Sequence, residues 1–199
     1  MAGKTPIKMW IDTTTEEALR QRLATEQVKL GEVLADPRWA ITWGMLTNER
    51  AQVRADQRAH LADLREGGDL LDKLTVLMTY AVRCELERRE WRRRWPPVPA
   101  TAPKAGRWPG SPDEGWTKKV STSIPADLAQ QVHAGCWHTS KDAIKALRRW
   151  RDKNPGIITR SNAPHLQEQY DELVKKVTTP GKVWRAALAA LLGPARESH

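Results

Sequence analysis

A short alternating segment, KKVSTSIP at residues 118–125, constrains the fold most, because it is followed directly by a helical pattern in a mostly helical chain. Val120, Thr122 and Ile124 would share one face of a strand, with Lys119, Ser121, Ser123 on the other. A lone strand of this length is not stable and must pair. The simplest partner is the same strand of a second chain, antiparallel across a two-fold axis. Residues 6–12, PIKMWID, also alternate and are the alternative partner within one chain.

Helical periodicity fills most of the remaining sequence, so the predicted fold class is mainly α. Thr14, with Glu17 three residues later, has the spacing of a capping box at the start of the first helix. Thr179 followed by Pro180 predicts the start of the last helix. The predicted helices cover residues 14–36, 48–66, 69–95, 125–134 and 140–153, followed by two that contain Leu166–Val177 and Val183–Leu191.

A stretch rich in proline and glycine, residues 96–117, interrupts these patterns and reads as a semi-extended linker. It predicts a helical N-terminal domain at residues 1–95, a strand-and-helix module at residues 118–155, and a C-terminal helical extension at residues 156–199. Residues 8–19 and 119–130 both have the order strand, cap and helix. This similarity of pattern raises the question of whether residues 6–35 are a degenerate second copy of the central module.

Residues 118–152 resemble the ribbon-helix-helix family of DNA-binding proteins. KKVSTSIP is similar to the strand of the methionine repressor type, and a proline, a short helix, a turn with Gly135 and a second helix follow in the family's order. The second helix has the family's aliphatic and alanine stripe at residues 143–147. Two features depart from the pattern: the turn after Gly135 is one residue longer, and Thr122 stands where an aliphatic residue is common.

The resemblance implies a dimer that binds double-stranded DNA in a sequence-specific manner. Lys119, Ser121 and Ser123 would contact base edges, because lysine can donate to guanine and serine can pair with several bases. Phosphate contacts would come from Lys118, Thr139, Ser140 and Lys141, the middle two at the free N–H groups that begin the second helix. The ordinary alternatives are an N-cap for the hydroxyl residues and a solvated lysine at position 119. Such modules serve as transcriptional repressors, plasmid partition proteins or relaxosome accessory proteins.

The net charge of +9 favours a polyanionic partner, nucleic acid before an anionic membrane. No apolar run approaches the length of a membrane span, and two cysteines do not make a disulfide framework, so a cytoplasmic protein is expected. No nucleotide-binding or hydrolase motif occurs, so we expect neither an enzyme nor a cofactor. His133, Cys136 and His138 offer only three clustered metal ligands, so no metal site is predicted.

A protein-interaction adaptor, or an antitoxin-like module that reads no DNA sequence, is the rival interpretation. The large helical region at residues 1–95 exceeds what a minimal repressor needs, and it is a candidate surface for a second protein. The two interpretations differ at the strand. An adaptor has no need for Lys119 and Ser121 to be exposed.

Overall fold

The computed structural model describes residues 3–104, 108–109, 116–155 and 164–193, and parts of the predicted linker and C-terminal extension lie outside these ranges. The expected mainly helical fold is confirmed, with one small antiparallel sheet among the described residues. The elements are β1 (Lys4–Ile11), α1 (Thr13–Leu34), the 3-10 turn η1 (Pro37–Trp39), α2 (Thr47–Gly67), α3 (Leu74–Arg88), β2 (Lys118–Pro125), α4 (Ala126–Lys153), α5 (Pro164–Lys175) and α6 (Pro180–Leu192).

The strand β2 pairs with β1 of the same chain, so the expectation of pairing with a second chain is wrong. The two strands are antiparallel and in register over their full length, from Lys4 opposite Pro125 to Ile11 opposite Lys118. Both strands alternate, so each contributes one face to the core. Ile7, Met9 and Ile11 are buried on that face of β1, and Ile124 is buried on β2.

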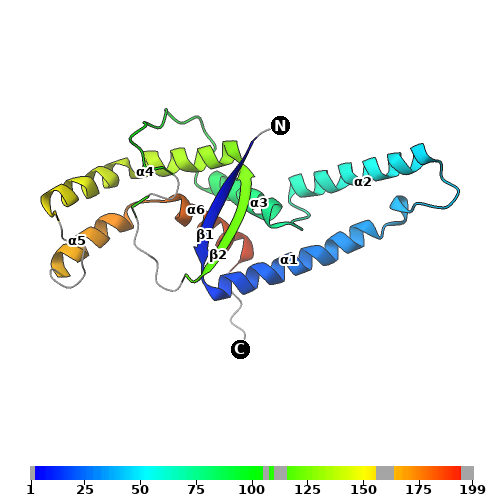
Figure 1. The fold of residues 1–199 in the computed structure, drawn as a ribbon, viewed down its shortest axis with the longest axis horizontal. Helices are drawn as coiled ribbons and strands as arrows, with labels where there is room; N and C mark the ends of the chain where they lie inside the picture. The colour runs from blue at the N-terminus through cyan, green and yellow to red at the C-terminus, as the bar shows by residue number, and fades with distance from the viewer. Residues whose placement is uncertain (1–2, 105–107, 110–115, 156–163, 194–199) are drawn as a thin grey trace.

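The two halves of the chain repeat one order of elements: a strand, a long helix, a helix that returns along it, and a third helix. Figure 1 shows the resulting arrangement, in which the hairpins α1–α2 and α4–α5 extend in opposite directions from the ribbon. The third helices, α3 and α6, pack together behind it. Four buried residues have the same spacing in the two helices. They are Leu77, Met78, Ala81 and Val82 in α3, and Val183, Trp184, Ala187 and Leu188 in α6.

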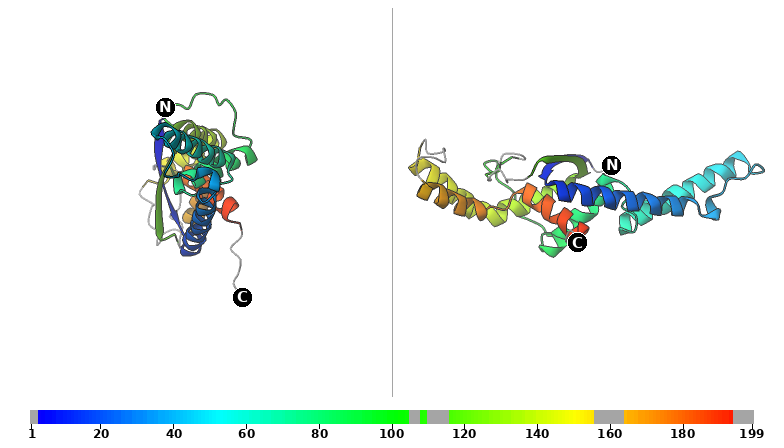
Figure 2. Two further views of the ribbon diagram at one scale, coloured as in Figure 1. Left: turned by 90° about the vertical axis from the view of Figure 1, so that its right-hand side faces the viewer. Right: turned by 90° about the horizontal axis from the view of Figure 1, so that it is seen from below.

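One hydrophobic core joins the two halves, so the predicted division into a domain at 1–95 and a module at 118–155 does not describe the packing. The core contains Met9 and Leu77 from the first half together with Ile124 and Val183 from the second. A smaller second cluster fills the α4–α5 hairpin, around Trp137. The ribbon covers one side of this helical layer, and its other side faces outward in both views of Figure 2.

The helix α4 is continuous, so the predicted turn between residues 134 and 140 is wrong. Glycine and hydroxyl residues at positions 135–140 imitate a turn in the sequence, but the structure uses them inside the helix. Gly135 is buried because the Trp91 indole packs directly against its backbone. The Thr139 hydroxyl donates to the Gly135 carbonyl 2.7 Å away, the back-bonding to residue i−4 that a helix accommodates.

Two helix starts differ from the predictions, one because of a local cap and one because of a tertiary contact. Asp12, not Thr14, caps α1, because its carboxylate accepts a 2.7 Å hydrogen bond from the Thr15 N–H. The third helix begins at Leu74 rather than residue 69, and its buried lead-in is held by Glu26, whose carboxylate accepts from the Leu71 N–H at 2.9 Å. The predicted cap of the last helix is confirmed, since the Thr179 hydroxyl accepts from the Lys182 N–H.

Candidate nucleic-acid interface

The outward face of the β1–β2 ribbon, which we call the ribbon face, contains three opposed pairs of side chains at its middle. These pairs are Pro6 with Ser123, Lys8 with Ser121, and Trp10 with Lys119. Lys8, Lys119 and Ser121 are exposed, Trp10 is 50% exposed, and Ser123 is half-buried. The alternation therefore places the three predicted base-reading residues on one surface.

The ribbon face is basic and contains no acidic side chain. Its outward rows contain three lysines, Lys4, Lys8 and Lys119, and neither strand contains Asp or Glu. A fourth lysine, Lys118, lies opposite Ile11 in the other row and is exposed at the end of the ribbon. The nearest carboxylate that pairs with these lysines in the described residues is Glu16 of α1, whose oxygen lies 3.9 Å from the Lys118 amine. A two-stranded ribbon has dimensions that the DNA major groove admits, so its charge and its shape suit the same partner.

The core face of β2 contains a polar residue, Thr122, at the position where the ribbon-helix-helix pattern commonly has an aliphatic residue. The hydroxyl oxygen of Thr122 is buried and has no hydrogen-bond partner among the described residues. Thr122 lies opposite Ile7, in the row that packs on the helices. An unpaired buried hydroxyl is unfavourable relative to a methyl group of the same shape, so the departure from the family's pattern has a physical consequence in this structure.

The predicted phosphate site is not assembled, because its helix start does not exist. Thr139 and Ser140 lie inside α4. The Ser140 side chain is fully buried, and its hydroxyl accepts from the Thr178 N–H at 2.8 Å, which ties α4 to the segment before α6. Lys141 is exposed on α4, whereas Lys118 lies in the ribbon. The four residues therefore do not form one site.

Sequence reasoning missed the contribution of β1 to this surface. Lys4, Lys8 and Trp10 lie on the ribbon face beside the predicted residues of β2. The available signal was the alternation in residues 6–12, together with the repeated order of strand, cap and helix in the two halves. Pairing the two strands with each other would have placed Lys8 opposite Ser121.

A groove of about 1120 Å³ runs beside β1. The segment after α3 forms its outer wall by crossing over α4. There the Trp95 ring stacks on the His138 ring, with centroids 5.3 Å apart, and a ring nitrogen of His133 lies 2.9 Å from the Pro103 carbonyl oxygen. The tryptophans Trp10, Trp95, Trp108 and Trp184 line the groove together with Arg94 and Arg185.

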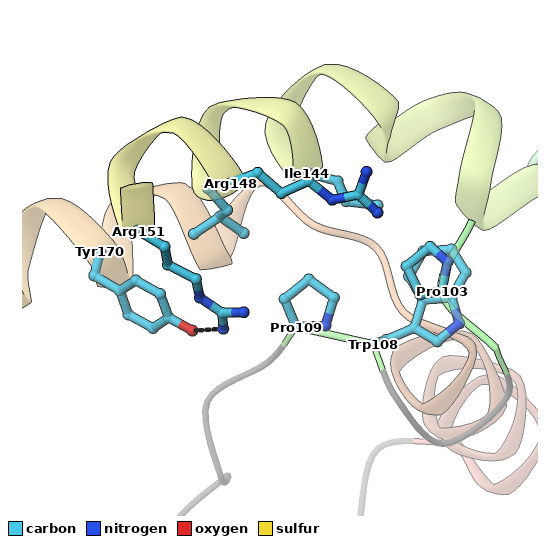
Figure 3. A pocket seen from close by; sticks show the side chains of 8 residues that line it. Pro103, Trp108, Pro109, Ile144, Arg148, Arg151 and Tyr170 are labelled. Atoms are coloured by element: carbon cyan, nitrogen blue, oxygen red, sulfur yellow. Dashed lines mark hydrogen bonds between the residues drawn. The ribbon is translucent and has the colours of Figure 1, made fainter. Parts of the chain in front are cut away.

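A smaller pocket of about 360 Å³ lies between α4, α5 and the linker (Figure 3). Two arginines reach into it, but both have partners. Arg151 donates to the Tyr170 hydroxyl oxygen at 2.9 Å, and Arg148 donates to the Thr101 carbonyl at 2.9 Å. These bonds hold the linker and α5 against α4, and we assign the pocket a structural role.

The described residues contain no cluster of three or more side chains that could hold a metal ion. Within the HAGCWH segment, both histidines contact backbone carbonyl oxygens, and the Cys136 side chain is completely buried. Burial raises the pKa of the Cys136 thiol to about 12, so it stays protonated at neutral pH. Cys136 is therefore a core residue here.

Comparison with known proteins found no family model, curated protein or solved structure that matches this chain. Among the helices of the described residues, none has both the length and the apolar composition that crossing a bilayer requires.

Proposed function

We propose that this chain binds double-stranded DNA through the ribbon face, as a ribbon-helix-helix protein whose two halves are fused in one polypeptide. The observation that carries the proposal is the ribbon itself. It is formed within the chain, it lies on the surface, and its outward side chains include lysines and serines, together with Pro6 and Trp10, but no carboxylate. Such side chains can pair with base edges in the major groove, while lysines at the ribbon's ends meet phosphates.

The repeated order of elements supports the assignment to this class. In the family, a strand and two helices from each of two subunits make the ribbon and the core beneath it. Here the strand, the beginning of the long helix and the third helix of each half take those places, which are β1, α1 and α3 in one half and β2, α4 and α6 in the other. The outer parts of α1 and α4, with α2 and α5, are then two insertions that extend as arms.

In this arrangement, the second helix of the family's motif corresponds to α3 and α6, and not to the last part of α4. These two helices lie against the ribbon, because α3 contacts β2 and α6 contacts β1. The proposed biological roles remain those of a transcriptional repressor, a plasmid partition protein or a relaxosome accessory protein. The two arms provide surfaces for a further protein in each of these settings.

The test is selection from random duplex DNA, followed by titration of variants on the selected and on a scrambled duplex. Lys8→Ala and Lys119→Ala should each weaken binding to the selected site by about 5- to 150-fold, the loss of one good base contact. Arg58→Ala, which removes an exposed cation from α2 away from the ribbon, should leave binding unchanged. The logarithm of affinity should fall with the logarithm of salt concentration, at roughly 0.9 per phosphate contact.

Circular dichroism shows whether each variant is folded, since both ribbon lysines are exposed and should not affect folding. If Lys8→Ala and Lys119→Ala bind the selected duplex as tightly as the parent chain, the ribbon is not the reading element. A chain that enriches no sequence at all contradicts the proposal as a whole.

A protein-interaction adaptor remains the second candidate function, and one observation favours it. The loop between α1 and α2, at the end of that arm, exposes large apolar side chains. Trp43 is 100% exposed, Leu46 is 63% exposed and Ile41 is 41% exposed. Clustered apolar side chains on a surface mark interaction sites. An adaptor should lose its activity in Trp43→Ser while Lys119→Ala has no effect, and a DNA reader should show the opposite.

A further inference from the structure

We infer that this chain reads a non-palindromic DNA site, in one orientation and as a single copy; the inference rests on the proposed function. Homodimeric readers present the same side chains twice, so their sites repeat the two-fold symmetry of the protein. The ribbon of this chain has the geometry of such a dimer, but its two strands differ in sequence at every outward position.

The register defines where the approximate two-fold axis crosses the ribbon. Asp12 is the N-cap residue of α1, and Pro125 occupies the equivalent position before α4. Lys8 precedes Asp12 by the same number of residues as Ser121 precedes Pro125, so Lys8 and Ser121 are counterparts in the two halves. Lys8 and Ser121 also face each other across the ribbon. An axis that relates the two strands therefore passes through this pair, at the middle of the ribbon face.

The remaining outward positions are then also counterparts, and their chemistry differs. Pro6 corresponds to Lys119 and Trp10 corresponds to Ser123. One strand therefore offers proline, lysine and tryptophan, whereas the other offers lysine, serine and serine. Proline provides no side-chain hydrogen bond, and the indole provides one donor and a large apolar surface.

The two ends of the ribbon consequently present different groups to DNA. At one end Trp10 lies opposite Lys119, which combines an apolar ring suited to a thymine methyl group with an amine suited to guanine. At the other end Pro6 lies opposite Ser123, a pair that offers bases one half-buried hydroxyl, and Lys4 lies beyond it at the last pair of the ribbon, where we expect it to contact phosphate. We therefore expect strong discrimination at the centre and at the Trp10–Lys119 end, and weak discrimination at the other end.

The two arms also differ, so a complex with DNA would have two distinguishable ends. The returning helix α2 has 21 residues, whereas its counterpart α5 has 12 residues. The two arms point in opposite directions from the ribbon (Figure 1). A chain that binds in one orientation therefore places the long arm, with its exposed Trp43, on a fixed side of the site.

The first experiment is selection from random duplex DNA with the parent chain and with a symmetrised variant, Pro6→Lys, Lys8→Ser and Trp10→Ser. These substitutions give β1 the outward side chains of β2. The parent should enrich a motif without two-fold symmetry, and the variant should enrich a palindrome. A palindrome enriched by the parent overturns the inference and leaves the proposed function intact, whereas no enrichment by the parent contradicts the proposed function.

The second experiment measures orientation and does not depend on the folding of the symmetrised variant. An iron chelate is attached at Ala51→Cys on α2, in a Cys84→Ser background that leaves only the buried Cys136. Cleavage of the selected duplex should occur on one side of the motif, and mass measurement should give one chain per duplex. Equal cleavage on both sides, or two chains per site, overturns the inference.

Discussion

Gly135 and Gly31 provide a matched test of the packing that keeps α4 continuous. A Cβ atom added at Gly135 would lie 2.2 Å from Cε3 of Trp91 and 2.5 Å from its Cδ2. Carbon atoms in contact are separated by about 3.5–4.0 Å, so the ring would have to move by more than 1 Å. Trp91 is only 6% exposed and has little space to do so.

The expected effect combines two opposing contributions. Replacing glycine by alanine inside a helix stabilises it by about 0.8–1 kcal/mol. Overpacking a core destabilises it by about 1–3 kcal/mol, and a clash with three atoms of a rigid ring belongs at the upper limit. Gly135→Ala should therefore lower the free energy of unfolding by about 2 kcal/mol and the melting temperature by about 4–8 °C for a chain of this length.

Gly31→Ala should do the opposite, because no atom lies within 4 Å of the added Cβ near the end of α1. It should raise the free energy of unfolding by a few tenths of a kcal/mol, up to about 1 kcal/mol. Urea denaturation followed by circular dichroism measures both variants against the parent chain. In a Trp91→Ala background, Gly135→Ala should no longer destabilise. A Gly135→Ala variant as stable as the parent would refute the packing argument.

Three further predictions concern single groups in the core and at its edge. Thr122→Val should raise the free energy of unfolding by about 1 kcal/mol in urea denaturation, because it removes a buried hydroxyl without a partner and leaves the ribbon face unchanged. In the folded chain a thiol reagent such as DTNB should modify Cys84 and not the buried Cys136, and after denaturation it should modify both; rapid modification of two thiols under native conditions would contradict the burial. The hydrogen bond from Arg65 lowers the pKa of Asp72 below 3.8, so this pair stabilises the fold above pH 4 and its contribution is lost as the pH falls through the lowered value. Arg65→Gln should therefore show a smaller loss of stability than the parent between pH 5 and pH 2, and equal losses would contradict the assignment.

Short sequence patterns predicted two features that depend on residues close together in the chain. Thr179 and Pro180 predicted the start of α6, and the alternation at residues 118–125 predicted β2 with its exposed Lys119 and Ser121. The continuity of α4 could not be predicted in this way. Gly135 reads as a turn residue until Trp91, far upstream in the chain, is known to pack against it.

The strand pairing was the least predictable feature, because alternation defines which face of a strand is buried and not which strand lies beside it. β2 could pair with a second copy of itself or with β1, and both choices bury Ile124. The packing of α3 against α6, through their equally spaced buried residues, brings the two halves together and so favours pairing of β2 with β1. The contribution of Lys8 to the candidate interface depended on that long-range choice.

Pairing between β1 and β2 joins segments that lie more than a hundred residues apart in the chain, and this sets the order of events on the ribosome. At about 5–20 residues per second, β1 leaves the ribosome on the order of 5–20 s before its partner strand has been made. During that interval the buried face of β1, with Ile7, Met9 and Ile11, has no strand to pair with. Nascent chains should therefore depend on chaperones until β2 emerges. In a circular permutant that begins after β1 and carries β1 at its C-terminal end, β2 would be made first and its buried face would remain unpaired until β1 emerges.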